Sequence, residues 1–413
     1  MKNKVIALLM AAAMLVATGC SATPDTPASS AAPAPAASSE ASSETPSEAP
    51  DEQAEEPLDD WSAKTGATTF PAIAKEDIKA GFVYVGDVGD MGYSYAHDQG
   101  RQSMIANLGL DESQVLVVTN VPEDSTCEDQ LRNLIDQGCN IIFTTSFGHM
   151  EWTANVAQEF PDVHFMHCSG YTTGENMSAY FGRMYEARYL SGIVAGMKAK
   201  EIGNPKLGYV AAMPIPEVVR GANAFALGVK AAYPEATVEV KFTNTWYDPA
   251  VEKQVAMELL NSGCGVLGQH CDTTAPQVAA QEKGGFAVGY NAATYDAAPQ
   301  AYLTSPLWDW GVYYTKQVQD AIDGKWASSN YWGEMKDGIV SLDALSPNCP
   351  EGSQAAVDEA KAKLDDGSLQ VFGGPLKDNQ GNEKVAQGVV MTDAEMLAFD
   401  WFVDNVIGSV PQA

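Results

Sequence analysis

Short apolar runs alternate with amphipathic stretches along the chain from about Ile78 onward. This alternation is typical of βαβ units, in which parallel strands are joined by crossover helices. The expected strands form two sets, of which the first comprises 82–86, 115–119, 141–145, 163–167 and 178–181. The second set comprises 207–211, 238–242, 266–269, 286–290 and 302–305. The clearest helices are expected at 123–137, 185–200, 216–233 and 249–262.

Two sets of strands with helices between them predict an α/β fold with two doubly wound lobes and a ligand cleft between them. We expect the first lobe at 76–183, the second at 184–305, and a crossover returning to the first lobe plus a C-terminal extension at 306–413. Within the last part, 338–342 is expected to add an edge strand and 393–406 a terminal helix. Ligands of open α/β sheets bind beyond the carboxyl ends of the strands, so we look there for function.

The first nineteen residues have the features of an export signal. Lys2 and Lys4 precede the apolar stretch 5–16, and small residues follow. The apolar stretch is too short to span a bilayer. Residues 15–20 resemble a bacterial lipobox, which implies that Cys20 is acylated and becomes the mature N-terminus. The alternative is an ordinary cleaved signal with an incidental cysteine.

Residues 20–70 are predicted to be an unstructured acidic tether. Between 21 and 60 the chain is built largely from Ser, Ala, Pro, Thr, Glu and Asp, and Leu58 is its one large aliphatic residue. Such a segment cannot bury enough apolar surface to offset the entropy of ordering. A lipid at one end and a globular body at the other predict a protein at the extracytoplasmic face of the cell membrane, bound to it through the lipid anchor alone.

Charge and composition narrow the choice of ligand. The chain has 24 basic and 54 acidic residues, which excludes nucleic acid as a partner, because binding to phosphates requires basic side chains. The predicted strand ends carry many aromatic and amide side chains and few cations. Stacking faces with hydrogen-bonding groups suit a flat, neutral, polar small molecule such as a nucleobase or nucleoside.

Motifs for catalysis and cofactors are absent from the sequence. Gly86, Gly89 and Gly92 have G-x-x-G-x-x-G spacing, which differs from the dinucleotide fingerprint, so we expect no cofactor. No H-E-x-x-H, G-x-S-x-G or P-loop pattern occurs, and the chain is predicted not to be an enzyme. The cysteines lack C-x-x-C spacing, so no metal site is expected. Cys264 and Cys271 flank an expected strand that would place them about 20 Å apart, so they cannot pair with each other, whereas other pairings stay open.

Four sequence blocks carry a family resemblance, and they lie at 90–100, 185–196, 221–228 and 244–249. In this order they resemble the basic membrane protein (BMP) family of substrate-binding lipoproteins, which serve ABC importers and include purine nucleoside receptors. Blocks 144–148, 215–221 and 244–249 resemble the purine-binding branch. The resemblance covers about residues 78–330. It implies a periplasmic-binding-protein type I fold, and an ABC permease and ATPase as partners.

The resemblance also implies that a purine is held between two aromatic rings. Tyr93 stands at the position of one family ring and Trp246 at the other. Asp90 and Tyr95 belong to the same block as Tyr93 and are further candidates for the binding site.

Two departures from the family pattern concern the sugar. Nucleoside binders have an aspartate for the ribose hydroxyls where this chain has Asn291. Their basic residue near the ribose has no counterpart after Ser305. Bulky Trp308 or Trp310 is expected to fill the sugar space, which favours a free base over a nucleoside.

Four more residues are candidates from their places at strand ends. Phe147 and His270 are expected to line the cleft. Asp272 and Asp309 either accept hydrogen bonds from purine N–H groups or cap the helices that follow.

The predicted function is that of an extracytoplasmic substrate-binding lipoprotein of an ABC importer, which binds a purine base, adenine-like, or a purine nucleoside between two lobes. Closure of the lobes about a hinge is the expected mechanism. Two alternatives stay open. One is a ligand-sensing receptor module of the same fold, and the other is a binding protein for another small polar solute such as a sugar.

Overall fold

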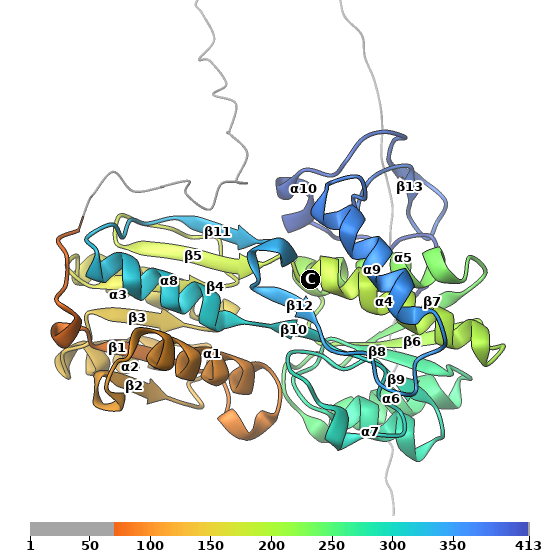
Figure 1. The fold of residues 1–413 in the computed structure, drawn as a ribbon, viewed down its shortest axis with the longest axis horizontal. Coiled ribbons are helices and arrows are strands. Elements are labelled where there is room, and N and C mark those ends of the chain that lie inside the picture. Colours follow the sequence, from red (N-terminus) through yellow and green to blue (C-terminus); the bar gives the residue numbers. More distant parts are fainter. Residues whose placement is uncertain (1–69, 412–413) are drawn as a thin grey trace, which may run out of the picture. The chain divides into compact units, whose positions relative to one another are not determined.

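The computed structural model describes residues 70–411, in which two parallel sheets are each flanked by helices (Figure 1). The first sheet has the strand order β11-β5-β4-β3-β1-β2, and the second has the order β15-β7-β6-β8-β9. This is the α/β architecture predicted from the sequence. The predicted signal peptide, the lipidation site Cys20 and residues 20–69 of the predicted tether lie outside the described residues, whereas Phe70 is buried in the core and is not part of a tether.

The strands of each sheet are short and pair in parallel throughout. Those of the first sheet are β1 (Ala80–Val83), β2 (Val115–Val118), β3 (Ile141–Thr144), β4 (His164–Cys168), β5 (Met177–Gly182) and β11 (Asn330–Gly333). Those of the second are β6 (Lys206–Ala211), β7 (Thr237–Phe242), β8 (Val266–Gln269), β9 (Phe286–Ala287) and β15 (Val406–Ile407). Every residue of β3 and β8 is buried, as expected for parallel strands covered on both faces.

Helices cover both faces of each sheet. On the first sheet they are α1 (Tyr93–Leu108), α2 (Thr126–Asp136), α3 (Met150–Glu159) and α8 (Trp310–Ile322). On the second they are α4 (Met184–Glu201), α5 (Pro216–Ala232), α6 (Pro249–Asn261) and α7 (Ala275–Glu282). Short 3₁₀ turns lie at Lys75–Asp77, Val88–Asp90, Glu112–Gln114, Phe147–His149, Tyr295–Ala297 and Met335–Asp337.

Helix starts are fixed by local sequence, and α6 is the clearest case. The Asp248 carboxylate accepts hydrogen bonds from the backbone N–H groups of Ala250 and Val251. Pro249 takes the first helical position, where no N–H is needed. The block at 244–249 therefore ends a loop and starts a helix in a defined direction.

The hydrophobic core has three parts. The largest runs through both lobes and includes buried side chains of α1, α8, α4 and α5. A second cluster lies between the second sheet and α6 and α7, and a third lies between the first sheet and α2 and α3. Because the largest cluster is shared, the two lobes are joined by packed side chains as well as by chain crossings.

The chain crosses between the lobes at three places (Figure 1). The first crossing lies between β5 and α4. The second passes through β10 (Pro306–Trp308) into α8, and the third leaves β11 through β12 (Val340–Leu342). Strands β10 and β12 pair antiparallel with each other and form a two-stranded ribbon between the two main sheets.

Three local expectations differ from the structure. Residues 302–305 do not form a strand, because only Tyr302 bridges to Ala287 and regular pairing begins at β10. Residues 338–342 contribute β12, which pairs with β10 and not with an edge of either main sheet. The helix expected at 393–406 ends early: α10 spans Asp393–Leu397, and β15 follows.

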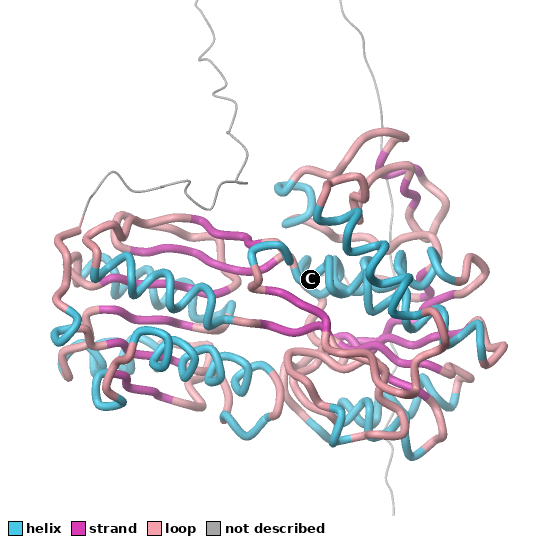
Figure 2. The backbone as a smooth tube through the Cα atoms, in the orientation of Figure 1, coloured by secondary structure: helices cyan, strands magenta, loops and turns pink. Residues whose placement is uncertain are grey.

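The last part of the chain packs on the second lobe. It contains α9 (Ser353–Asp365), β13 (Leu376–Lys377), β14 (Glu383–Val385), α10 and β15. Helix α9 contacts α4, α10 contacts α5, and β15 pairs with β7. Figure 2 shows that loops make up much of this part.

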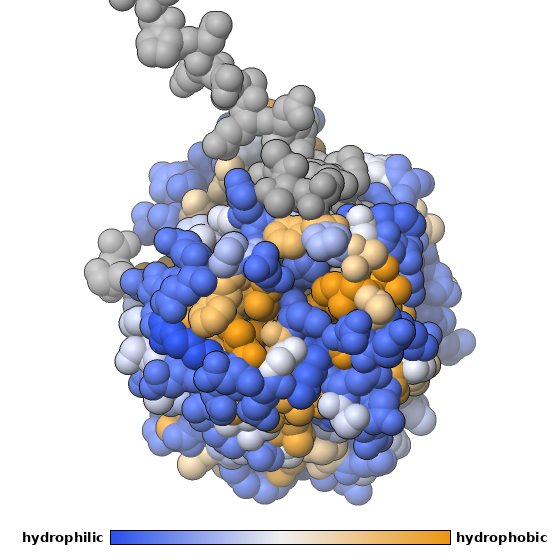
Figure 3. Space-filling model, turned by 90° about the vertical axis from the view of Figure 1, so that its left-hand side faces the viewer, coloured by the Kyte–Doolittle hydropathy of each residue, from blue (hydrophilic) through white to orange (hydrophobic). Residues whose placement is uncertain are grey.

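The surface of the first lobe reflects the polar composition of the chain. Figure 3 views the molecule from the side of the first sheet, where hydrophilic residues dominate and hydrophobic ones form separate patches. Among the described residues, no helix has the length and apolar character that a bilayer span requires.

Candidate functional site

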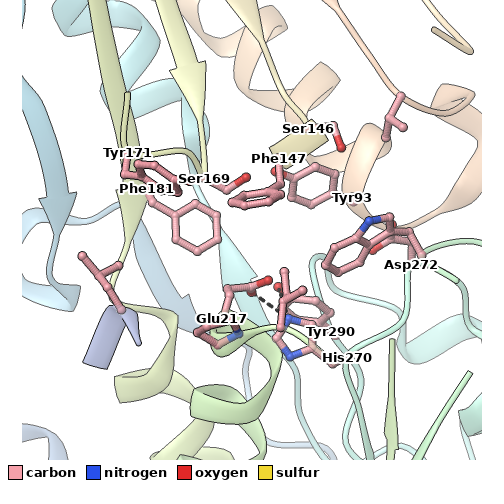
Figure 4. Close-up of a pocket in the computed structure, with 15 residues that line it drawn as sticks. Tyr93, Ser146, Phe147, Ser169, Tyr171, Phe181, Glu217, His270, Asp272 and Tyr290 are labelled. Carbon is pink, nitrogen blue, oxygen red and sulfur yellow. Dashed lines mark hydrogen bonds and ion pairs between the residues drawn. The ribbon is translucent and has the colours of Figure 1, made fainter. Parts of the chain in front are cut away.

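A cavity of about 170 Å³ lies where the strand ends of the two lobes meet (Figure 4). The first lobe contributes Val85, Tyr93, Ser146, Phe147, Ser169, Tyr171 and Phe181. The second contributes Ile215, Pro216, Glu217, Trp246, His270, Asp272 and Tyr290, and Leu397 comes from α10. Almost all of these residues follow the carboxyl end of a strand, or lie near it, as the rule for open α/β sheets predicts.

Tyr93 is held at the start of α1 by Asp90. The Asp90 carboxylate accepts hydrogen bonds from the backbone N–H groups of Gly92, Ser94 and Tyr95, at 2.8, 2.8 and 3.0 Å. Burial raises the pKa of Asp90, although these three donors lower it. Asp90 therefore fixes the helix start and does not itself line the cavity. Tyr95 does not line the cavity either.

The Tyr93 ring has a fixed orientation. Its hydroxyl donates a hydrogen bond of 2.6 Å to the carbonyl oxygen of Thr145. The ring also packs edge-to-face with His97, with centroids 4.4 Å apart. Figure 4 shows the rings of Tyr93 and Phe147 side by side at the edge of the cavity. Phe147 is 37% exposed, so apolar ring surface faces the space where a ligand would lie.

His270 and Glu217 form a hydrogen-bonded pair on the opposite side (Figure 4). His270 Nε2 lies 2.7 Å from Glu217 Oε1, and His270 Nδ1 lies 3.3 Å from the Tyr209 hydroxyl. Burial and the charge of Arg188 lower the pKa of His270 to about 4, so its ring is neutral at pH 7. The Nε2–H group therefore donates to Glu217, and Nδ1 accepts from Tyr209.

Glu217 is ionised beside this neutral histidine. Burial alone raises the pKa of Glu217, but the favourable interactions with His270, Arg220 and Arg188 outweigh it, and the net shift is downward. Arg188 lies 3.8 Å above the ring of Tyr290, which lines the cavity, and donates to the carbonyl oxygen of Gln269. The second lobe thus presents a carboxylate to the cavity, with its counter-charges behind.

Asp272, Asn291 and Trp308 form a buried chain of hydrogen bonds. Asn291 Nδ2 donates to Asp272 Oδ1 at 3.2 Å, and Trp308 Nε1 donates to Asn291 Oδ1 at 3.2 Å. Burial, together with the charges of Asp90 and Glu252, raises the pKa of Asp272 well above its usual value. Asp272 lines the cavity, whereas the amide of Asn291 is engaged on both sides behind it.

The structure therefore brings together some of the candidate residues and not others. Tyr93, Phe147, Trp246, His270 and Asp272 line one cavity.

Asn291 and Asp90 lie behind the lining residues, and Trp308 stacks on Trp310 at 4.3 Å and packs beside Phe181. Asp309 is exposed and directly precedes α8.

Asp272 is not the residue that caps a helix, because Thr274 holds the N-cap position of α7. The ligand roles of all these residues stay predictions.

Several lining residues were missed by the sequence reasoning. Glu217 and Tyr290 had a usable signal, because Glu217 lies in the block 215–221 and Tyr290 ends an expected strand. Ser169, Tyr171 and Phe181 also follow or end strands, and a stricter use of the strand-end rule would have included them. Leu397 had no such signal, because it is far in the sequence from every expected strand end.

The cavity lining defines what kind of ligand fits. Aromatic rings from both lobes and two carboxyl groups, of Glu217 and Asp272, face the space, and the lining contains neither Lys nor Arg. A phosphorylated or carboxylate ligand would meet like charge, whereas a ring with N–H donors would meet acceptors. Within residues 70–411, no cluster of three or more His, Cys, Asp and Glu side chains is arranged to hold a metal ion.

Comparison with solved structures identifies the fold. The chain is similar to an ABC transporter solute-binding protein from Conexibacter woesei, with a TM-score of 0.60 and 24% identity over 71% of this chain and 98% of that one. It is also similar to a solute-binding protein from Aeropyrum pernix, with a TM-score of 0.61 and 20% identity over 73% of this chain and 93% of that one. The fold is the type I fold of periplasmic solute-binding proteins.

The sequence comparison identifies the family. Residues 77–369 match the Bmp family, described as "ABC transporter substrate-binding protein PnrA-like". The chain belongs to this family, as the sequence blocks predicted. Its function is that of an ABC transporter substrate-binding protein, a class that works outside the cytoplasm and passes a small solute to a permease and its ATPase.

Two relatives show the range of ligands named in the family. The chain is 37% identical to a purine-binding protein of Brucella abortus over 83% of this chain and 96% of that protein. It is 36% identical to a putative ABC transporter glucose-binding protein of Haloferax volcanii over 81% of this chain and 82% of that protein.

Proposed function

We propose that this protein binds a purine base in the cavity between its lobes and delivers it to an ABC permease. The observation that carries the proposal is the combination of aromatic rings with two acceptor carboxyl groups in a lining without cations. A purine offers two flat faces for stacking and N–H groups at its edge. The similarity to the purine-binding protein of Brucella abortus supports the same ligand class.

A free base fits the site better than a nucleoside. The Asn291 amide, which replaces the ribose-binding aspartate of nucleoside binders, is buried outside the cavity lining and is hydrogen-bonded to Asp272 and Trp308, so it is not placed to meet ribose hydroxyls. The cavity volume of about 170 Å³ is also below the roughly 300–1,000 Å³ of pockets for drug-sized ligands.

A sugar is the second candidate ligand, because a relative of similar identity is named as a putative glucose-binding protein. Sugars also stack on aromatic rings, but they need many hydrogen bonds around their edge. This lining offers few polar side chains beyond Ser146, Ser169, Glu217, His270 and Asp272, and Ser146 already donates to Glu123. The balance of ring surface over polar groups favours the purine.

The role that we propose involves binding and release without covalent chemistry. We also propose that acylated Cys20 anchors the mature protein at the outer face of the membrane. A Cys20→Ser variant should leave the membrane fraction, whereas Cys349→Ser should stay in it. Equal membrane retention of the Cys20→Ser variant would contradict the anchor.

A thermal-shift screen of the purified mature protein tests the ligand class. The panel contains adenine, guanine and hypoxanthine, their nucleosides, glucose and amino acids. Stabilisation by bases more than by their nucleosides is the expected result. Stabilisation by glucose alone would be consistent with the transport role but would contradict the purine assignment. A protein that binds purine but supports no purine uptake would favour the role of a sensor.

A further inference from the structure

Leu397 lines the ligand cavity from a part of the chain that lies beyond the family match. The match ends at residue 369, whereas α10 spans Asp393–Leu397. Leu397 is 42% exposed, and it is the one residue of the cavity lining that does not belong to either α/β lobe. Leu397 thus adds apolar surface to the lining of the cavity.

Two buried arginines hold α10 in this place. The guanidinium of Arg183 donates to both carboxylate oxygens of Asp393, each at 2.7 Å. Arg220 Nη1 donates to the carbonyl oxygen of Met396, also at 2.7 Å. The side chains of Arg183 and Asp393 are 6% and 14% exposed, so the ion pair is largely shielded from water. A bidentate pair of this kind fixes orientation as well as distance.

The chain after α10 is fixed to the second lobe as well. Asn223 Nδ2 donates to the carbonyl oxygen of Trp401, and Asn223 Oδ1 accepts from the N–H group of Val403. Strand β15 then pairs with β7. Leu397 therefore cannot swing away from the cavity without breaking these buried contacts.

The same contacts locate Leu397 along the cavity. Arg183 comes two residues after Phe181, and Arg220 comes three residues after Glu217. Since α10 is bound to both arginines, Leu397 lies toward the end of the cavity formed by Phe181 and Glu217. The buried hydrogen-bond chain through Asp272 and Asn291 belongs to a different set of strand ends.

We propose that Leu397 is a specificity-determining residue, which closes one end of the cavity and limits the ligand to the size of a free base. The inference rests on the proposed purine-binding function and deepens it. It assigns to the C-terminal segment the exclusion of the sugar that was expected of Trp308 or Trp310. Trp308 packs behind Phe181, whereas Leu397 reaches the cavity directly.

Isothermal titration of the full mature chain with adenine and adenosine tests the inference. In Leu397→Ala the affinity for adenosine should rise roughly tenfold or more, while that for adenine changes less than about threefold. Leu397→Trp should narrow the cavity and weaken adenine roughly tenfold. Val389→Ala is the matched control, because Val389 is 51% exposed in the same segment and does not line the cavity.

The possible outcomes distinguish a failure of the inference about Leu397 from a failure of the proposed purine-binding function. Adenine binding by the wild type with an unchanged adenine-to-adenosine ratio in Leu397→Ala would overturn the inference alone. Failure of the wild type to bind any purine would overturn the proposed function and the inference together. Far-UV circular dichroism of each variant establishes that it is folded.

Discussion

A Cβ atom built on Gly92 would lie 1.9 Å from the carbonyl oxygen of Asp272. Gly92 precedes α1 in the first lobe, and Asp272 follows β8 in the second, so the backbones of the two lobes touch at this point beside the cavity. The contact leaves no space for a side chain at position 92, which requires glycine. The lobes are therefore in contact at this edge, which is the arrangement expected of a closed binding protein.

Gly92→Ala should hold the lobes apart. The added methyl group meets backbone atoms of Asp272, which cannot rotate away as a side chain would. We expect adenine affinity to fall roughly tenfold or more, which is about 1.4 kcal/mol or greater, as measured by isothermal titration. Gly174→Ala is the control, because its Cβ would meet only the Cβ of Met177 at 3.8 Å. Equal affinities for the two variants would contradict closure at Gly92.

Trp246→Ala should remove a stacking face from the ligand. Base stacking on an aromatic side chain contributes about 1–3 kcal/mol, and Trp246 lines the cavity. We expect a loss of that size in binding free energy with an unchanged far-UV spectrum. Tyr247→Ala serves as the control, since Tyr247 is 53% exposed and lies outside the cavity lining. Unaltered affinity in Trp246→Ala would show that the ring does not contact the ligand.

Asn291→Ala should destabilise the fold as well as the site. The substitution leaves the buried Asp272 carboxyl group and the Trp308 indole N–H without their hydrogen-bond partner. An unsatisfied buried polar group costs about 1–3 kcal/mol, and the free energy of unfolding in urea should fall by that order. Asn261→Ala is the control, because Asn261 is exposed, and it should change the free energy of unfolding by less than about 0.5 kcal/mol. A stability equal to that of the wild type would mean that this chain of hydrogen bonds is not formed.

The contribution of His164 to the stability of the protein should decrease as the pH falls from 6.5 toward 4. His164 is buried, and its ring stacks on Trp326 with centroids 4.3 Å apart. Burial lowers its pKa to about 4, whereas an unfolded histidine has a pKa near 6.5. The unfolded chain thus binds the proton first, so acidification favours unfolding.

For His164 alone, this linkage is worth about 2 kcal/mol between pH 7.5 and pH 5. His164→Phe keeps an aromatic ring beside Trp326 and removes the titrating group. Urea unfolding at the two pH values should show a loss for this variant that is smaller by about that amount. An identical pH dependence in wild type and variant would contradict the buried neutral state of His164.

The fold was largely predictable because its signal is local. Parallel strands that are buried on both faces, such as β3 and β8, have sequences that are short apolar runs. The helices between the strands begin at capping residues such as Asp248. The end of the chain was less predictable. Residues 393–406 have helical periodicity in part, but α10 stops at Leu397, and the strand at 406 depends on β7, far away in the sequence.

The site was predictable only in outline. The strand-end rule placed Tyr93, Trp246 and Asp272 near one another, because parallel strands bring their carboxyl ends to one edge. The strand-end rule could not distinguish a residue that lines the cavity from a residue behind the lining, such as Asn291, because this difference depends on side-chain packing. The rule could not predict Leu397, because the position of α10 follows from one buried ion pair and one hydrogen bond between distant segments.

The most direct test of the account is a crystal structure of the protein with adenine bound. We predict that the purine ring lies in the cavity in contact with Tyr93 and Trp246, with its N–H groups toward the carboxyl groups of Asp272 or Glu217. Adenine bound elsewhere on the protein, or a different solute retained in the cavity in its presence, would contradict the proposed site.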